Sequence, residues 1–177
     1  MTPLVTKADL DDYKYIADSL KNTTSWGQFV SEAQMLDVKR QIGDALLDEI
    51  VTEFDAGAVS VANQTLLDGG SYVYNEKTYL FQGLSAAIIY YAFGRFTNRT
   101  SFNYTAAGIV LKESDFSTPI SDKVMQRLET EARLTADAIM CENIAFLNRN
   151  YADYPLWTEY CGSGTCNDKQ YFKVIGD

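Results

Sequence analysis

The segment from Leu84 to Phe96 constrains the fold of this chain most, because nearly all of its residues are apolar or aromatic. Only Ser85, Gly94 and Arg95 interrupt the run. A helix that is apolar on every side has no face to offer to water, so the segment predicts a helix surrounded by other elements. It is too short to cross a bilayer, which takes about 20 residues. We therefore expect a buried central helix in a single globular domain.

The residues just before this helix are typical of a β-hairpin. Aromatic and β-branched residues fill Tyr72 to Tyr74 and, except for Leu80, Thr78 to Phe81. The sequence Asn75-Glu76-Lys77 between them suits a tight turn. Ten of the 23 aromatic residues fall between Tyr72 and Tyr104. This concentration predicts that the hairpin and the buried helix form the centre of the fold.

Other stretches repeat their apolar residues at helical spacing. Gly43 divides one such stretch, because glycine costs a helix interior about 1 kcal/mol relative to alanine. Ser121 is the expected N-cap of the longest helix. The pattern predicts a short helix within residues 6–20, two helices at about 26–42 and 44–55, and a long helix at 122–148.

The remaining segments are expected to connect these helices. Residues 56–70 are interpreted as a polar connection, and residues 97–117 as irregular with one short strand at 107–111. The predicted fold class is mainly α: a helical bundle with a small β-hairpin insertion and an extended C-terminal arm. Residues 1–150 form the helical domain, with the hairpin at about 70–82, and residues 151–177 form the arm.

The composition argues against catalysis. The chain has no histidine, the usual general base and commonest metal ligand near neutral pH, so Ser-His-Asp and Cys-His sites are excluded. It also lacks the glycine-rich loops that hold phosphates. Cys161 and Cys166 are too few to hold structural zinc, and Cys141 is expected in the core of the long helix. We expect no enzyme activity, no cofactor, no metal and no permanent disulfide.

The charge balance excludes another class of function. The chain has 24 acidic and 15 basic residues, which gives a net charge of -9. Tight binding of nucleic-acid phosphates requires a positive patch, so a DNA- or RNA-wrapping protein is not expected. The N-terminal residues lack the basic start and apolar run of a secretory signal, which predicts synthesis in the cytoplasm.

One alternative uses the surface carboxylates. Asp44 and Asp48 share a helical face, and a carboxylate pair is the minimum for glycoside hydrolysis. Together with exposed tyrosines they suit a small acidic carbohydrate-binding protein or hydrolase. The same carboxylates also suit a solvated helix face, and aromatic residues are enriched at protein interfaces. An interaction role therefore stays open beside the enzymatic one.

Several blocks of the sequence resemble the head-tail connector proteins of tailed bacteriophages, which are also called adaptor or ring proteins. The resemblance is to those of crAss-like and related phages of Bacteroidetes. In order along the chain, the blocks are SEAQMLDVKRQIGDALLDEI from Ser31, LLDGGSYVYNEKTYLFQGL from Leu66, AIIYYAFGRF from Ala87, GIVLKESDFSTPIS from Gly108 and FLNRNYADYPLW from Phe146.

This resemblance implies a structural role in the virion. Proteins of this kind form a ring of about twelve copies between the portal and the tail or a neighbouring ring, and genomic DNA passes through the lumen as cargo. An acidic channel wall suits this role because it repels phosphates. No membrane is involved, and the chain is made in the host cytoplasm. The residues expected to contact neighbouring subunits or rings are Tyr72, Tyr74, Asn75, Tyr79, Asp115, Phe116, Ser117 and Pro119.

Overall fold

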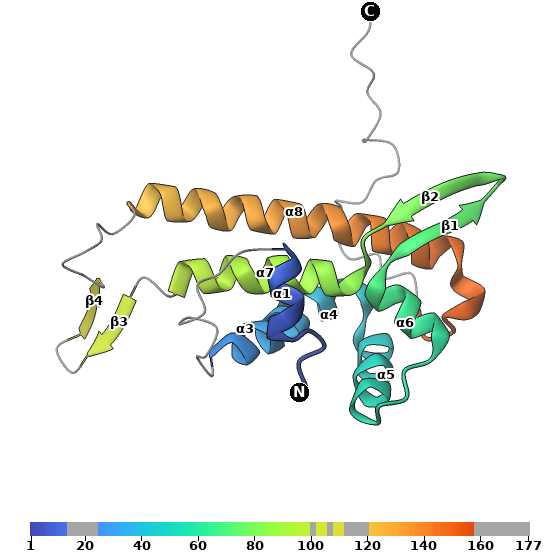
Figure 1. Ribbon diagram of the computed structural model, residues 1–177, viewed down its shortest axis with the longest axis horizontal. Coiled ribbons are helices and arrows are strands. Elements are labelled where there is room, and N and C mark those ends of the chain that lie inside the picture. The colour runs from blue at the N-terminus through green and yellow to red at the C-terminus, as the bar shows by residue number, and fades with distance from the viewer. Residues whose placement is uncertain (14–24, 100–101, 106–107, 112–120, 158–177) are drawn as a thin grey trace, which may run out of the picture.

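Two long helices form the spine of the protein. The computed structural model describes residues 1–13, 25–99, 102–105, 108–111 and 121–157. Helices α7 (Gly83–Arg99) and α8 (Asp122–Arg149) run antiparallel and side by side along the long axis of the molecule (Figure 1). The first was predicted from its continuous apolar run and the second from apolar periodicity, and each begins and ends within three residues of its expected bounds.

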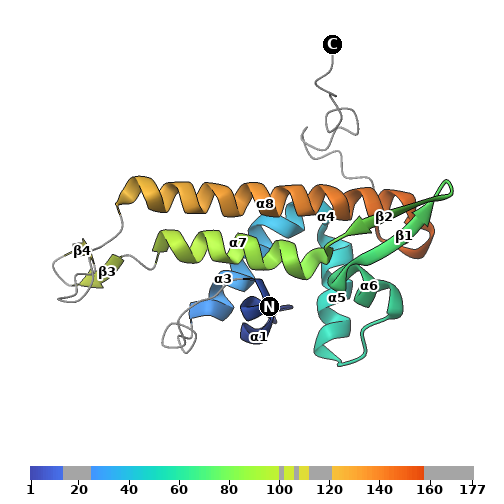
Figure 2. The same cartoon turned by 45° about the horizontal axis from the view of Figure 1, so that its top comes forward.

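Shorter helices cover the side of α7 that faces away from α8. In Figures 1 and 2, α1 and α3 lie against the middle of α7, whereas α5 and α6 lie near its first turn. Their bounds are α1 (Lys7–Tyr13), α3 (Ser25–Ala33), a π-helical turn (Gln34–Val38), α4 (Lys39–Ile42), α5 (Asp44–Asp55) and α6 (Val61–Asp68). The mainly helical fold class is confirmed, and so is the break at Gly43, where φ is 86°.

The core is built around α7, as its composition predicts. Its residues Leu84, Ala86, Ala87, Ile88, Ile89 and Ala92 are fully buried. Large side chains from α5, α6 and α8 pack on them, including Leu46, Leu66 and Met140. Burying each large aliphatic side chain stabilises the fold by about 1.5–3 kcal/mol relative to leaving it exposed.

The predicted hairpin is present. Strands β1 (Gly70–Tyr74) and β2 (Lys77–Phe81) pair antiparallel, with Tyr72 opposite Tyr79 and Gly70 opposite Phe81. The turn has two residues, Asn75 and Glu76, both with positive φ of 49° and 63°. Positive φ at both central residues matches the right-handed twist of the strands. Lys77 is thus the first residue of β2 and not part of the turn.

Helix α6 corrects the expectation of a polar connection over residues 56–70. Ser60 caps it by accepting a hydrogen bond from the Asn63 amide at 3.3 Å. The Glu53 carboxylate of α5 accepts two more, from the Ser60 amide at 2.9 Å and the Asn63 side chain at 2.8 Å. These contacts and the buried Leu66 and Leu67 stabilise this short helix.

A second small sheet also differs from the expectation. Residues 97–117 were expected to hold one short strand, but β3 (Phe102–Thr105) pairs antiparallel with β4 (Gly108–Leu111). The register places Phe102 opposite Leu111 and Thr105 opposite Gly108. The predicted strand at 107–111 is therefore one half of a hairpin.

The chain after α8 returns to the helical body. A 3-10 turn (Tyr151–Asp153) leads to Tyr154 and Trp157, which are 3% and 9% exposed. Tyr154 Oη donates a hydrogen bond to the Ala62 carbonyl at 2.6 Å, and Trp157 Nε1 donates one to Asn148 Oδ1 at 2.9 Å. Tyr154 and Trp157 thus anchor the beginning of the predicted arm to α6 and α8, while the residues around them are exposed. Residues 158–177 lie outside the described residues.

Cys141 differs from its expected state. It was expected to be a core residue of α8, and a permanent disulfide was not expected. Cys141 is instead half-buried and disulfide-bonded. Cys161 and Cys166 lie outside the described residues.

Candidate functional site

Aromatic side chains fix the inner face of the hairpin to α8. Phe81 of β2 stacks on Phe146 of α8 with ring centroids 4.1 Å apart and an interplanar angle of 10°. Tyr72 meets Phe146 edge to face at 5.1 Å and stacks on Tyr79 at 5.5 Å. Such ring pairs contribute about 0.5–1.5 kcal/mol each beyond the area they bury. The hairpin is therefore held by its own chain along one face.

Arg149, the last residue of α8, completes this cluster. Its guanidinium carbon lies 4.1 Å from the Tyr79 ring centroid and 5.3 Å from that of Tyr74. Its Nη1 donates a hydrogen bond to Tyr72 Oη at 2.7 Å. Sequence reasoning missed Arg149, although its spacing of three from Phe146 places both on one helix face.

The predicted contact residues of the hairpin divide into two groups. Tyr72 and Tyr79 are half-buried against α8, whereas Tyr74 is 40% exposed beside Arg149 and Asn75 is exposed at the turn. Asp115, Phe116, Ser117 and Pro119 lie outside the described residues. The role of all eight in contacts between subunits stays a prediction.

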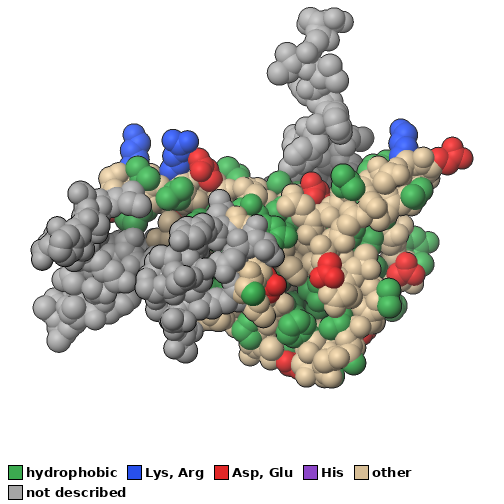
Figure 3. Space-filling view, viewed as in Figure 1, with side chains coloured by type: hydrophobic (Ala, Val, Ile, Leu, Met, Phe, Trp, Pro, Cys, Tyr) green, Lys and Arg blue, Asp and Glu red, His purple; other side chains and the backbone are tan. Residues whose placement is uncertain are grey.

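The outer face of the hairpin is apolar and exposed. Val73 of β1 is 70% exposed and Leu80 of β2 is 77% exposed. Neighbouring residues of a strand point to opposite faces, so both lie opposite Tyr72 and Tyr79. Figure 3 shows a basic and an acidic side chain together at the tip of the hairpin, with hydrophobic side chains nearby. We call Val73, Leu80 and the tip residues Asn75 to Lys77 the hairpin surface.

An ion cluster joins α3, the π-helical turn and α7. Arg95 pairs with Asp37 at 2.7 Å, and Arg99 pairs with Glu32 at 2.7 Å. Burial raises the pKa of Glu32, but hydrogen bonds from Arg99 and Gln28 and the charges of both arginines outweigh it and hold this pKa below its ordinary value. Because these charges are paired with each other across the helices, the cluster serves to hold α3 and the π-helical turn on α7.

Tyr91 links three helices by hydrogen bonds. Its hydroxyl accepts one from Gln41 Nε2 at 2.8 Å and donates one to the Asp137 carboxylate. Burial and the adjacent Asp137 carboxylate both raise the pKa of Tyr91 well above its ordinary value. The phenol therefore stays protonated near neutral pH and serves as a hydrogen-bond donor.

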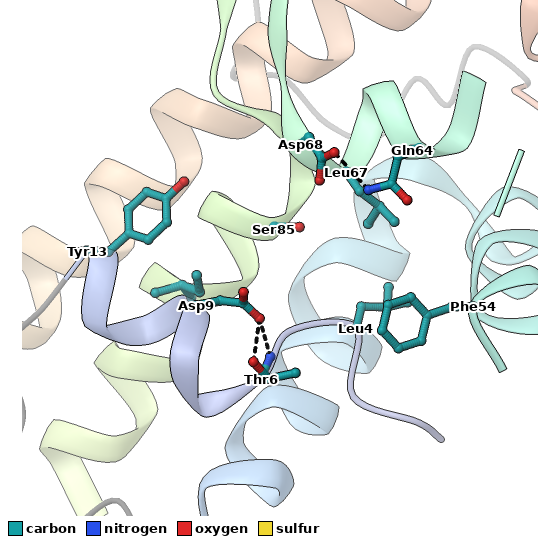
Figure 4. A pocket seen from close by; sticks show the side chains of 10 residues that line it. Leu4, Thr6, Asp9, Tyr13, Phe54, Gln64, Leu67, Asp68 and Ser85 are labelled. Carbon is teal, nitrogen blue, oxygen red and sulfur yellow. Dashed lines mark hydrogen bonds between the residues drawn. The ribbon is translucent and has the colours of Figure 1, made fainter. Parts of the chain in front are cut away.

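A cleft of about 410 Å³ opens between the N-terminal segment and helices α5, α6 and α7 (Figure 4). Two carboxylates lie in its wall. Asp9 Oδ2 accepts hydrogen bonds from the Thr6 amide at 2.6 Å and the Thr6 hydroxyl at 2.7 Å, and Asp68 Oδ2 accepts one from Gln64 at 2.8 Å. The other lining residues are Leu4, Tyr13, Phe54, Leu67, Ser85 and Ile89.

The carboxylates of the enzymatic alternative lie elsewhere. Asp44 and Asp48 are exposed on α5, and Asp44 pairs with Lys39 at 2.9 Å. Neither lines the cleft. Within the part of the chain that the structure describes, no group of three or more cysteine, aspartate or glutamate side chains is placed to hold a metal ion. None of the described helices is long and apolar enough to span a membrane.

The comparisons with known proteins give a family but no function. No curated protein matches the chain, and no solved structure matches it. Residues 38–167 match the model of the family described as "Family of unknown function (DUF6712)". The matched stretch runs from the π-helical turn through α8 and includes the hairpin. The chain therefore belongs to the DUF6712 family.

Proposed function

We propose that this protein is a structural subunit of a phage virion, which assembles into a ring between the portal and the tail. The protein acts by contacting other virion proteins and catalyses no reaction. The ring contacts the portal on one side and a tail or neighbouring ring protein on the other. Genomic DNA passes through the lumen.

The hairpin is the observation that carries this proposal. Its inner face is fixed to α8 by Phe81, Phe146 and Arg149, so its position costs little conformational entropy when a partner binds. Its outer face presents Val73 and Leu80 to solvent. A rigid element that exposes aliphatic side chains is suited to protein contact, because burying them against a partner provides binding free energy.

The charge of the chain supports the same proposal. Acidic residues outnumber basic ones by 24 to 15. A ring with a net negative charge repels the phosphates of passing DNA and does not hold the genome in place. The resemblance of the sequence blocks from Ser31 to Trp157 to phage connector proteins, in their order along the chain, also supports it.

The direct test is binding to the portal protein of the same virion. Purified protein is mixed with portal and imaged by electron microscopy, and an added annular layer is expected. The variant V73S/L80S should lose the layer, because it removes the exposed apolar side chains of the hairpin. L134S is the matched control, since Leu134 is 63% exposed on α8 and remote in sequence from the hairpin.

Two outcomes would overturn the proposal. One is the absence of any annular layer with unmodified protein at saturating concentration. The other is the absence of this polypeptide from intact, purified virions analysed by mass spectrometry. If V73S/L80S and L134S both keep the layer, the ring role stands but the hairpin is not its contact.

A further inference from the structure

The side of α8 opposite its buried residues carries a line of uncharged side chains. Positions three or four apart along a helix share a face. We call the outer stripe the five residues that this spacing groups: Leu134, Ala138, Cys141, Ala145 and Asn148. The buried residues of α8 lie on the other side of the helix, among them Ala136, Met140 and Leu147. Charged residues normally fill a helix face that points away from the core, so the uncharged outer stripe favours a contact surface.

The outer stripe is open at one end and partly covered at the other. Leu134 is 63% exposed and Ala138 is exposed, whereas Cys141 and Ala145 are half-buried. The last residue of the stripe, Asn148, accepts a hydrogen bond through Oδ1 from Trp157 Nε1 at 2.9 Å. The chain that follows Trp157 therefore starts at the covered end of the stripe.

The disulfide of Cys141 identifies a segment that reaches the stripe. The chain has three cysteines, so the bonding partner of Cys141 within this chain is Cys161 or Cys166. Cys161 follows Trp157 by four residues and Cys166 by nine. Asn148, where Trp157 is anchored, lies about 10 Å from Cys141 along the helix axis. An extended chain spans about 3.3 Å per residue, so either cysteine is within reach.

We propose that the outer stripe is the docking site of this chain's own C-terminal arm, and that a disulfide from Cys141 to Cys161 or Cys166 holds the arm there. The four residues between the two arm cysteines are Gly-Ser-Gly-Thr, which are small and uncharged. Small residues on both sides let the two backbones approach closely at Ala145. The contact lies within one chain, so this inference does not depend on the proposed ring function.

The disulfide makes this docking reversible. When it forms, the two thiols lose two electrons and two protons to a small-molecule disulfide, which is released as two thiols. A dithiol reverses the reaction by forming its own cyclic disulfide. Because reducing compartments keep thiols reduced, the arm is held by the covalent bond only under oxidising conditions. The third cysteine stays a thiol in both states.

Peptide mapping tests the disulfide directly. A mixture of natural and ¹⁵N-labelled protein is equilibrated with oxidised glutathione, alkylated, and digested with trypsin without reduction. We expect peptide 134–149 joined to peptide 150–169 of the same isotope, and both peptides separate after dithiothreitol. Fragment ions then identify Cys161 or Cys166 as the partner. An alkylated Cys141, a bond between Cys161 and Cys166, or a mixed-isotope pair would overturn the inference.

Two arginine variants distinguish docking on the stripe from a bond without docking. The equilibrium constant for forming the disulfide is measured in glutathione buffers by counting free thiols from the intact mass. A145R should lower this constant about tenfold, because the new side chain occupies the space of the docked arm. A138R is the matched control, since Ala138 lies on the same stripe but is exposed, and it should leave the constant unchanged. Equal constants in A145R and A138R would overturn the docking site.

Discussion

Arg95 donates two hydrogen bonds to one carboxylate oxygen of Asp37, from Nε at 3.0 Å and from Nη2 at 2.7 Å. The two residues are 58 positions apart in the sequence, and the pair joins the π-helical turn to α7. Their side chains are only 12% and 13% exposed. Each residue has a more distant second partner, Arg133 at 3.9 Å from Asp37 and Glu32 at 3.8 Å from Arg95. A charge that loses its main partner at such a position is poorly compensated, so the pair stabilises the docking of the π-helical turn on α7.

Replacing Arg95 by methionine should destabilise the protein strongly. The change keeps most of the apolar stem but leaves the Asp37 carboxylate without its main partner, at an expected cost of about 3 kcal/mol. Denaturant unfolding followed by circular dichroism measures it. The control is R127M, because Arg127 and Glu131 are 78% and 55% exposed and such pairs contribute about 1 kcal/mol or less. Equal losses in both variants would contradict this prediction.

Three glycines should respond differently to alanine. Gly69 and Gly83 have φ of 77° and 83°, and a Cβ on Gly69 would lie 2.5 Å from the backbone carbon of Gln82. G69A and G83A should therefore each cost about 3 kcal/mol or more. In G94A the new Cβ would lie 3.6 Å from Ala132 Cβ, an ordinary contact.

G94A serves as the matched control for these two variants, because Gly94 lies in the interior of α7. Alanine is favoured over glycine in a helix interior by about 1 kcal/mol, so G94A should leave stability unchanged or raise it. Thermal unfolding of the three variants provides the measurement. A large loss of stability in G94A, or no loss in G69A, would contradict the distances described between these glycines and their neighbours.

The contribution of Glu53 should depend on pH. Hydrogen bonds from the Ser60 amide and the Asn63 side chain hold the pKa of Glu53 below its ordinary value of 4.5. A lowered folded-state pKa contributes stability that is present above the unfolded-state value and is lost as the pH falls through the folded-state value. The stability difference between the unmodified protein and E53Q should therefore be largest near pH 7 and shrink below about pH 4.5. A difference that stays constant from pH 7 to pH 3 would contradict it.

Arg149 should stabilise the hairpin against local opening. R149M removes the hydrogen bond to Tyr72 and the contacts with the rings of Tyr74 and Tyr79, which together are worth about 1–2 kcal/mol. Native-state hydrogen exchange should then be roughly tenfold faster at the amides of β1 and β2, with α7 unchanged. R127M is again the control. Unchanged exchange in the hairpin would mean that Phe81 and Phe146 alone hold it.

Local sequence signals located most of the helices and the hairpin. A continuous apolar run placed α7 and apolar periodicity placed α8 within a few residues, and Gly43 marked the junction of α4 and α5, because these signals depend only on residues close in sequence. The same kind of signal missed α6. Its helix depends on Glu53, which lies seven residues before Ser60 and accepts hydrogen bonds that no local pattern indicates.

Contacts between distant residues account for the rest. The sequence by itself determined which stretches are helical, that α7 is buried and that a hairpin precedes it, since backbone propensity and apolar spacing act locally. Only the tertiary structure decided that Phe81 meets Phe146, that Arg149 covers the tyrosines, and that Asp9 and Asp68 share a cleft. These pairings join residues 59 or more positions apart, or from separate helices, and arise only when the apolar faces pack together.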